Sequence, residues 1–140
     1  MTRDEIAALL DQRAAAMLGS DASNVPSLYT PDAAIRSPMF GAVVGIDEIV
    51  ESYRKTGEIY ANIHTTLETR IVEENRAAEV NTVRATHVGE FAGIPASHRQ
   101  ITFTAVSVYE FRDGRIADER RVYDFTSVLM QLGVLRAKPA

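Results

Sequence analysis

The sequence predicts an α+β fold in which helices cover one face of a curved, mostly antiparallel sheet. Three observations predict it. Apolar residues recur at helical spacing as far as residue 57, segments rich in Thr, Ile and Val follow from residue 63, and short turns join these later segments. Helices followed by consecutive strands are typical of this class. Because no linker, repeat or low-complexity segment interrupts the chain, we expect one domain over residues 1–140.

The helical part carries clear boundary signals. Residues 2–5 read Thr-Arg-Asp-Glu, a capping box, and the helix that follows should end near Gly19. A short helix is expected over residues 24–29, and a third from residue 46 or 47 to Gly57. Arg13 falls within the first apolar stripe, so it should face the interior. The stripes are Ile6, Leu9, Leu10 and Met17 in the first helix and Ile46, Ile49, Val50 and Tyr53 in the third.

The second half of the chain reads as strands. Asp113-Gly114 is a strong signal for a two-residue hairpin turn between the last two of them. An apolar loop is expected over residues 39–45, and a short final helix over residues 125–135. The expected strands cover residues 33–37, 63–73, 77–91, 101–111 and 116–124.

The hairpin sets which side chains share a face. If Asp113-Gly114 is the whole loop, Phe111 pairs with Ile116 and Phe103 pairs with Asp124. A bulge would shift this register by one residue and exchange the faces of one strand. In the simple register the apolar face should meet the helices; it carries Phe103, Ala105, Ser107, Tyr109, Phe111, Ile116 and Val122, with Asp118, Arg120 and Asp124 among them.

Asp124 is the candidate for chemistry in that register. A carboxylate aimed at an apolar face must be hydrogen-bonded, paired with a cation or held protonated. We therefore interpret Asp124 as a general base or acid, with Arg120 and Arg13 orienting it or stabilising developing negative charge. The alternative is a buried Arg–Asp pair that only orders the core.

Other side chains are candidates for the same pocket. His87 could relay a proton or donate a hydrogen bond to a substrate carbonyl, although a lone strand histidine is more often structural. The three histidines lack the spacing of metal ligands, so no metal site is expected. Met39, Phe40, Tyr53 and Phe103 suit the wall of an apolar substrate-binding pocket, and ordinary core packing explains them equally well.

The composition narrows the class of protein. The chain has a net charge of −4, no cluster of Lys and Arg, and no cysteine. These features argue against a nucleic acid or an anionic membrane as partner and exclude thiolate chemistry. No apolar run approaches the roughly 20 residues that span a bilayer, and the first residues are acidic rather than basic. There is no phosphate-binding loop or dinucleotide fingerprint. We expect a cytoplasmic protein that binds a small molecule.

Three motifs resemble one family. Residues 86–99, THVGEFAGIPASHR, resemble T-H-x-G-E-F-x-G-I-P-x-[TS]-G-R. Residues 113–124, DGRIADERRVYD, followed by QLG at 131–133, resemble D-G-K-I-A-E-x-W-x-x-x-D followed by Q-L-G, and residues 28–32 resemble L-Y-A-P-D. These patterns are those of the SnoaL-like polyketide cyclases, or ester cyclases, in the superfamily named after nuclear transport factor two.

The resemblance implies a cone-shaped α+β barrel, with a curved sheet wrapped by the N-terminal helices around a pocket. It implies acid–base catalysis without a cofactor, in which an aspartate that Asp124 matches removes a proton beside a carbonyl before an aldol ring closure. Isomerases, epoxide hydrolases with an Asp–Arg pair, and non-catalytic binding modules share the superfamily, which is usually dimeric. In this chain Arg120 replaces the usual Trp, and His98 replaces a Gly.

Overall fold

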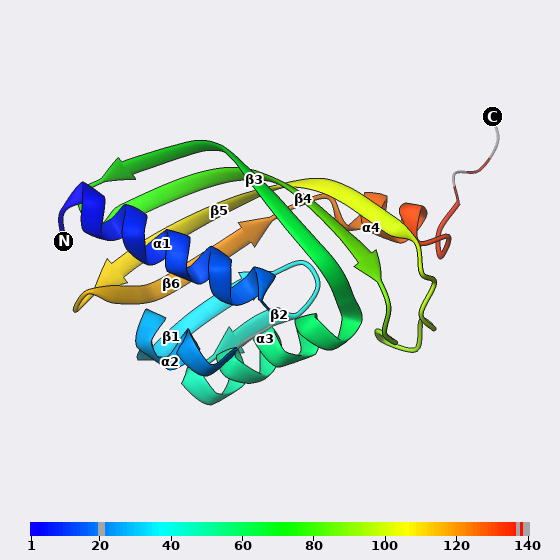
Figure 1. Cartoon of the computed structure of the whole chain (residues 1–140), viewed down its shortest axis with the longest axis horizontal. Helices are drawn as coiled ribbons and strands as arrows, with labels where there is room; N and C mark the ends of the chain where they lie inside the picture. The colour runs from blue at the N-terminus through cyan, green and yellow to red at the C-terminus, as the bar shows by residue number, and fades with distance from the viewer. Residues whose placement is uncertain (20–21, 137, 139–140) are drawn as a thin grey trace.

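One strongly curved sheet forms the body of the protein, seen in a computed structural model that describes residues 1–19, 22–136 and 138 (Figure 1). Within those residues, six strands lie in the order β2-β1-β6-β5-β4-β3, and all neighbours are antiparallel except the parallel pair β1 and β6. The strands are β1 Tyr29–Ser37, β2 Gly41–Val44, β3 Tyr60–Glu73, β4 Arg76–His87, β5 Gln100–Arg112 and β6 Arg115–Val122. The helices are α1 Arg3–Leu18, η1 Ala22–Asn24, α2 Val25–Leu28, α3 Ile46–Ile59 and α4 Phe125–Gln131.

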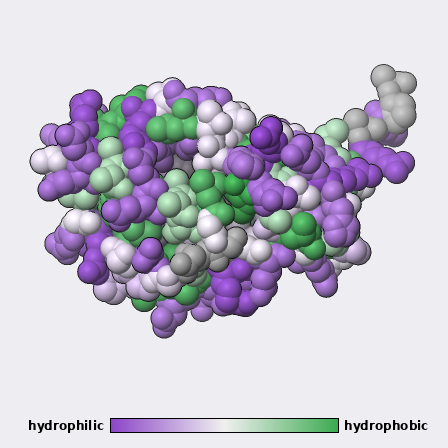
Figure 2. All heavy atoms as spheres, viewed as in Figure 1, coloured by the Kyte–Doolittle hydropathy of each residue, from purple (hydrophilic) through white to green (hydrophobic). Residues whose placement is uncertain are grey.

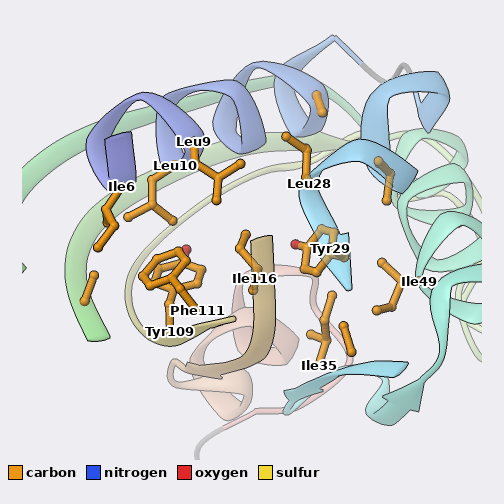
Figure 3. Packing of buried hydrophobic residues seen from close by; sticks show 14 of the residues in the cluster. Ile6, Leu9, Leu10, Leu28, Tyr29, Ile35, Ile49, Tyr109, Phe111 and Ile116 are labelled. Atoms are coloured by element: carbon orange, nitrogen blue, oxygen red, sulfur yellow. The ribbon is translucent and has the colours of Figure 1, made fainter. Parts of the chain in front are cut away.

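The first helix lies across the concave face of the sheet (Figure 1). Its predicted capping box is confirmed, because the Thr2 hydroxyl accepts from the Glu5 amide while the Glu5 carboxylate accepts from the Thr2 amide. The apolar face of α1 packs over one end of the sheet, where Figure 3 shows its side chains above those of β5 and β6. The residues in this contact are Ile6, Leu9, Leu10, Tyr109, Phe111 and Ile116.

Several boundaries differ from the prediction: β1 begins at residue 29 rather than 33, β3 begins at residue 60 rather than 63, and β4 ends at residue 87 rather than 91. The expected loop over residues 39–45 contains strand β2, whose residues 41–44 pair with residues 34–37 of β1. A short apolar run does not distinguish a strand from a loop, and only pairing with β1 decides it. Helix α3 passes the predicted stop at Gly57 and ends at Ile59, where the chain turns directly into β3.

The hairpin between β5 and β6 contains the main correction. Asp113 and Gly114 have φ angles of +53° and +73°, the two-residue turn that was predicted, and Phe111 pairs with Ile116. Beyond that pair, however, β6 contains one extra residue, Ala117, so Glu110 pairs with Asp118. The predicted pairing of Phe103 with Asp124 is therefore wrong.

The bulge exchanges the two faces of β6. Glu119 and Tyr123 lie on the concave side, where Glu119 is fully buried and the Tyr123 ring lies 4.8 Å from the ring of Phe103. Arg120 and Val122 lie on the convex side and are exposed. Val106 and Val108 are exposed on that side too. The resemblance implies a homodimer through the outer face of the sheet, to which Val106, Val108 and Tyr123 were expected to contribute. Tyr123 does not lie on that face, and the dimer stays a prediction.

Two apolar clusters occupy the concave side. One lies under α1, and the other lies near α4 and includes Ile59, Tyr60, Ala85, Ile101, Val128 and Leu132. Figure 2 shows hydrophobic residues reaching the surface near the middle of one face, among mainly hydrophilic ones. None of the helices in the described part of the chain is long and apolar enough to cross a membrane.

Candidate functional site

A cavity of about 220 Å³ opens on the concave side of the sheet, and the second apolar cluster forms most of its wall. Residues of α1, the β1–β2 connection, α3, β3 to β6 and α4 line it. This volume is somewhat below the roughly 300–1,000 Å³ of sites for drug-sized ligands, so the cavity suits a small molecule. The apolar wall includes Met17, Met39, Phe40, Ile63, Phe103 and Phe125.

Four polar residues cross the cavity in a single row. Arg70 on β3 pairs with Glu79 on β4, Glu79 pairs with Ser107 on β5, and Ser107 pairs with Arg121 on β6. All four line the cavity. Paired strands lie about 4.8 Å apart, so the register places these four side chains side by side. The rows toward the second apolar cluster are less polar and contain Val83, Phe103, Ala85 and Ile101.

Glu79 is held by an arginine that also reaches the rim. Arg70 Nε donates to Glu79 Oε2 at 2.8 Å, and Arg70 Nη2 donates to Asp11 Oδ1 at 2.7 Å. The Glu79 side chain is 6% exposed, whereas that of Asp11 is 70% exposed. Both contacts from Arg70 to Glu79 fall on Oε2, and Oε1 receives no hydrogen bond from the described residues. Oε1 is therefore the oxygen that can accept a proton from a bound molecule.

Glu119 lies beyond this row and is saturated with donors. Arg13 Nε and Nη2 each donate to it at 2.9 Å, the Tyr29 hydroxyl donates at 2.7 Å, and Arg121 Nε donates as well. The Tyr53 hydroxyl lies 2.6 Å from that of Tyr29 and extends the network. A carboxylate offers about four lone-pair sites, so Glu119 has none left for a substrate.

The electrostatics agree with that reading of Glu119. Burial opposes its ionisation, but the positive charges of Arg121 and Arg13 outweigh burial and lower its pKa from 4.5 to about 2. Burial and the charge of Glu119 raise the pKa of Tyr29 well above its usual value. Glu119 thus carries a fixed negative charge that holds two arginines in place.

The lowered pKa predicts acid sensitivity. The pKa of Glu119 is about 2 in the folded protein, compared with 4.5 for an unperturbed glutamate in the unfolded chain. The stabilisation that ionised Glu119 provides is therefore complete above about pH 4.5 and is lost as the pH falls toward 2. The difference corresponds to about 3 kcal/mol in the free energy of unfolding. Urea unfolding at pH 5 and at pH 2.5 should show that the wild type loses more stability than Glu119→Gln. Equal losses in both proteins would contradict the assignment.

The structure places only some of the predicted pocket residues at the cavity. Arg13, Met39, Phe40 and Phe103 line it. Tyr53 does not; it is buried behind the cavity, where its hydroxyl bonds to Tyr29.

Asp124 and Arg120 do not face the cavity, so the predicted geometry is wrong for both. Asp124 is exposed and caps α4, with its Oδ1 accepting from the Ser127 amide at 2.9 Å. Arg120 is exposed on the convex side because of the bulge, beside a shallow hollow that Arg36 also lines. The predicted pairing of these two groups around a substrate has no geometric basis.

His87 is fully buried but does not line the cavity. Its Nδ1 accepts from the Ser97 amide at 3.1 Å and lies 2.8 Å from the Ser97 hydroxyl. The ring proton therefore belongs on Nε2, which is buried without a hydrogen-bond partner in the described residues. In this position His87 anchors the connection between β4 and β5.

The polar row was missed in the sequence, although one signal for it exists. Glu79 is an even number of residues from Ala77, Val83 and Ala85 along β4, so its side chain lies on the same apolar face as theirs. The same reasoning was applied to Asp124. Arg121 and Glu119 carry no such signal, because the bulge alone turns them inward. No group of three or more His, Cys, Asp or Glu in the described residues is arranged to hold a metal ion.

Comparisons with known proteins agree with this architecture. TsrD from Streptomyces laurentii is 24% identical with a TM-score of 0.86, over 96% of this chain and 99% of its own. AclR from Streptomyces galilaeus is 25% identical with a TM-score of 0.82, over 99% and 91%. An NTF2-like protein of unknown function from Burkholderia pseudomallei K96243 is 18% identical with a TM-score of 0.77, over 94% and 98%. These likenesses confirm the cone-shaped α+β fold that was predicted.

Sequence comparison identifies the family. A search of curated proteins gives no match. The family model of the SnoaL-like polyketide cyclases matches residues 8–132, which is most of the chain. The chain, with the cavity on the concave side of its curved sheet, therefore belongs to the SnoaL-like polyketide cyclase family.

Proposed function

We propose that the protein is a cofactor-independent acid–base enzyme acting on a small, mostly apolar, carbonyl-bearing substrate. The observation that supports it best is the row of Arg70, Glu79, Ser107 and Arg121 across an otherwise apolar cavity. Apolar walls with a few convergent polar groups are typical of a substrate site. In this proposal Glu79, rather than Asp124, is the general base.

Glu79 has a suitable partner on its own strand. Asn81 follows it by two residues, so both side chains lie on the same face about 7 Å apart along the strand, and both line the cavity. The Asn81 side chain makes no hydrogen bond within the described residues, which leaves its amide free to donate to a substrate. A donor beside a base is the arrangement that enolisation requires.

The mechanism follows from these positions. Glu79 Oε1 removes the proton from the carbon beside a substrate carbonyl, and the electron pair of that C–H bond moves to the carbonyl oxygen as an enolate. Asn81 donates a hydrogen bond to this oxygen, and Arg70 keeps Glu79 oriented through its bond to Oε2. The enolate carbon then attacks a second carbonyl and closes a ring, and the resulting alkoxide takes the proton from Glu79, which regenerates the base. Alternatively, where the enolate is conjugated with a C=C bond, its far carbon takes that proton from Glu79 and the double bond is isomerised.

Epoxide opening by an Asp–Arg pair has less support. That alternative relied on Asp124 and Arg120, and neither faces the cavity. A non-catalytic binding module remains the competing proposal, because the saturated Glu119 network orders the core whether or not turnover occurs.

Proton abstraction can be measured without the natural substrate. We expect the wild type to accelerate exchange of the α-protons of a small ring ketone, such as 2-tetralone, for deuterium in D2O. Proton NMR measures the loss of the α-proton signal, and Glu110→Gln, on the exposed side of β5, should match the wild type. If the ketones perturb the NMR signals of cavity residues but none exchanges faster than in buffer, the binding module replaces the enzyme as the proposed function.

A further inference from the structure

The buried groups around the cavity carry unequal charge. Three guanidinium groups, those of Arg13, Arg70 and Arg121, have side chains only 12%, 18% and 15% exposed. Two buried carboxylates, Glu79 and Glu119, oppose them. The remaining nearby acid, Asp11, lies at the rim, where solvent screens its charge. The inner cavity thus has one positive charge in excess.

The excess lies at Arg13 and Arg121 rather than at Arg70. Arg70 divides its donors between Glu79 and Asp11. Arg13 and Arg121, by contrast, share the single carboxylate of Glu119, whose lone pairs are already filled. Arg121 Nη2 is buried and has no acceptor among the described residues. That atom itself is covered, so an anion in the cavity would meet the two guanidinium groups through the parts of Arg13 and Arg121 that line it. Because their charge is only half compensated by Glu119, an anionic ligand should bind well beside them.

We propose that Arg13 and Arg121 form an anion-binding subsite at the inner end of the cavity, and that the substrate is a keto acid whose carboxylate occupies it. As a statement about the substrate, this inference rests on the proposed function. As a statement about binding, it rests on the geometry of the two arginines alone.

The distance along the polar row defines the class of keto acid. Arg121 and Glu79 lie on strands separated by β5, so their backbones are about 10 Å apart. A carboxylate at Arg121 therefore places the reacting carbonyl near Glu79 only if several bonds separate the two groups. The apolar walls favour a ring or a short hydrocarbon chain between them. An aryl keto acid satisfies these requirements, whereas a 2-oxo acid is too short.

A pair of matched probes tests the subsite. 4-Acetylbenzoate and its neutral amide, 4-acetylbenzamide, have nearly the same shape, and calorimetric titration at pH 7 measures the affinity of each. We expect the wild type to bind the carboxylate at least tenfold more tightly. Arg121→Gln should weaken binding of the carboxylate by about 10- to 100-fold and change binding of the amide by less than about threefold.

Control variants separate a specific subsite from general attraction. Arg84→Gln, on the exposed side of β4, removes the same charge outside the cavity and should preserve the preference for the carboxylate. Circular dichroism checks the fold of each variant. If Arg121→Gln does not fold, the comparison of the two probes in the wild type still decides the question. Equal affinity for the two probes, or an unchanged preference in folded Arg121→Gln, would overturn the proposal.

Failure of the subsite and failure of the enzyme give different results. The titration involves no turnover. Preferential binding of the carboxylate together with no proton exchange would support the anion-binding subsite and contradict the proposed enzyme activity. Exchange of neutral ketones together with equal affinity for the two probes would do the reverse.

Discussion

Replacing Glu79 by Gln is expected to slow α-proton exchange by a factor of about 10² to 10⁴, the usual contribution of a positioned general base. Glutamine keeps nearly the same volume and can still accept from Arg70 through its amide oxygen, so the cavity should keep its shape. It lacks a carboxylate oxygen to take the proton at neutral pH. The rate of deuterium incorporation into a ring ketone, measured by NMR, gives the factor directly.

Two further variants make the role of Glu79 specific. Glu79→Asp retains a carboxylate but withdraws it, so its exchange rate should lie between those of the wild type and Glu79→Gln. Glu110→Gln changes a glutamate on the opposite side of the sheet and should have no effect. If Glu79→Gln keeps the wild-type rate, the base is another group, and the mechanism proposed for the polar row does not hold.

Replacing Glu119 by Gln is expected to lower the free energy of unfolding by about 3–5 kcal/mol. The substitution leaves two buried guanidinium groups, those of Arg13 and Arg121, without a counter-charge. It also replaces one acceptor of Glu119 with an NH₂ donor among groups that already donate. The melting temperature should fall by at least about 10 °C.

Asp118→Asn is the matched control for this effect. Asp118 directly precedes Glu119 but lies on the other face of β6, where it pairs with the exposed Arg36. An exposed ion pair contributes at most about 1 kcal/mol, so this variant should melt close to the wild type. Denaturant unfolding of the three proteins in parallel gives the comparison. A loss in Glu119→Gln no larger than in Asp118→Asn would show that the two arginines are solvated rather than dependent on Glu119.

The sequence allowed the elements with local signals to be predicted. The capping box of α1 and the Asp113-Gly114 turn depend on residues near one another in the chain, and the structure contains both. The alternation along β5 correctly placed Tyr109 and Phe111 inside. Strand β2 could not be predicted in the same way, because its pairing with β1 is what distinguishes it from a loop.

The candidate site was harder to predict for two physical reasons. The register of β6 depends on one unpaired residue, Ala117, and no residue type in that stretch predicts a bulge. Asp124 precedes a helix, where an aspartate is also a preferred N-cap, and that local hydrogen bond to Ser127 is the one formed. Glu79, in contrast, could have been found, since it shares the alternation of Ala77 and Ala85 on β4.

The unpaired Ala117 has a consequence for comparing this chain with its relatives. Two homologues can have similar sequences along β6 and still present opposite faces of that strand to their ligands, if only one of them contains the bulge. Transferring a functional residue between them by column position then assigns the role to a side chain on the wrong side. Within this family, spatial superposition of the strand is needed before any such transfer.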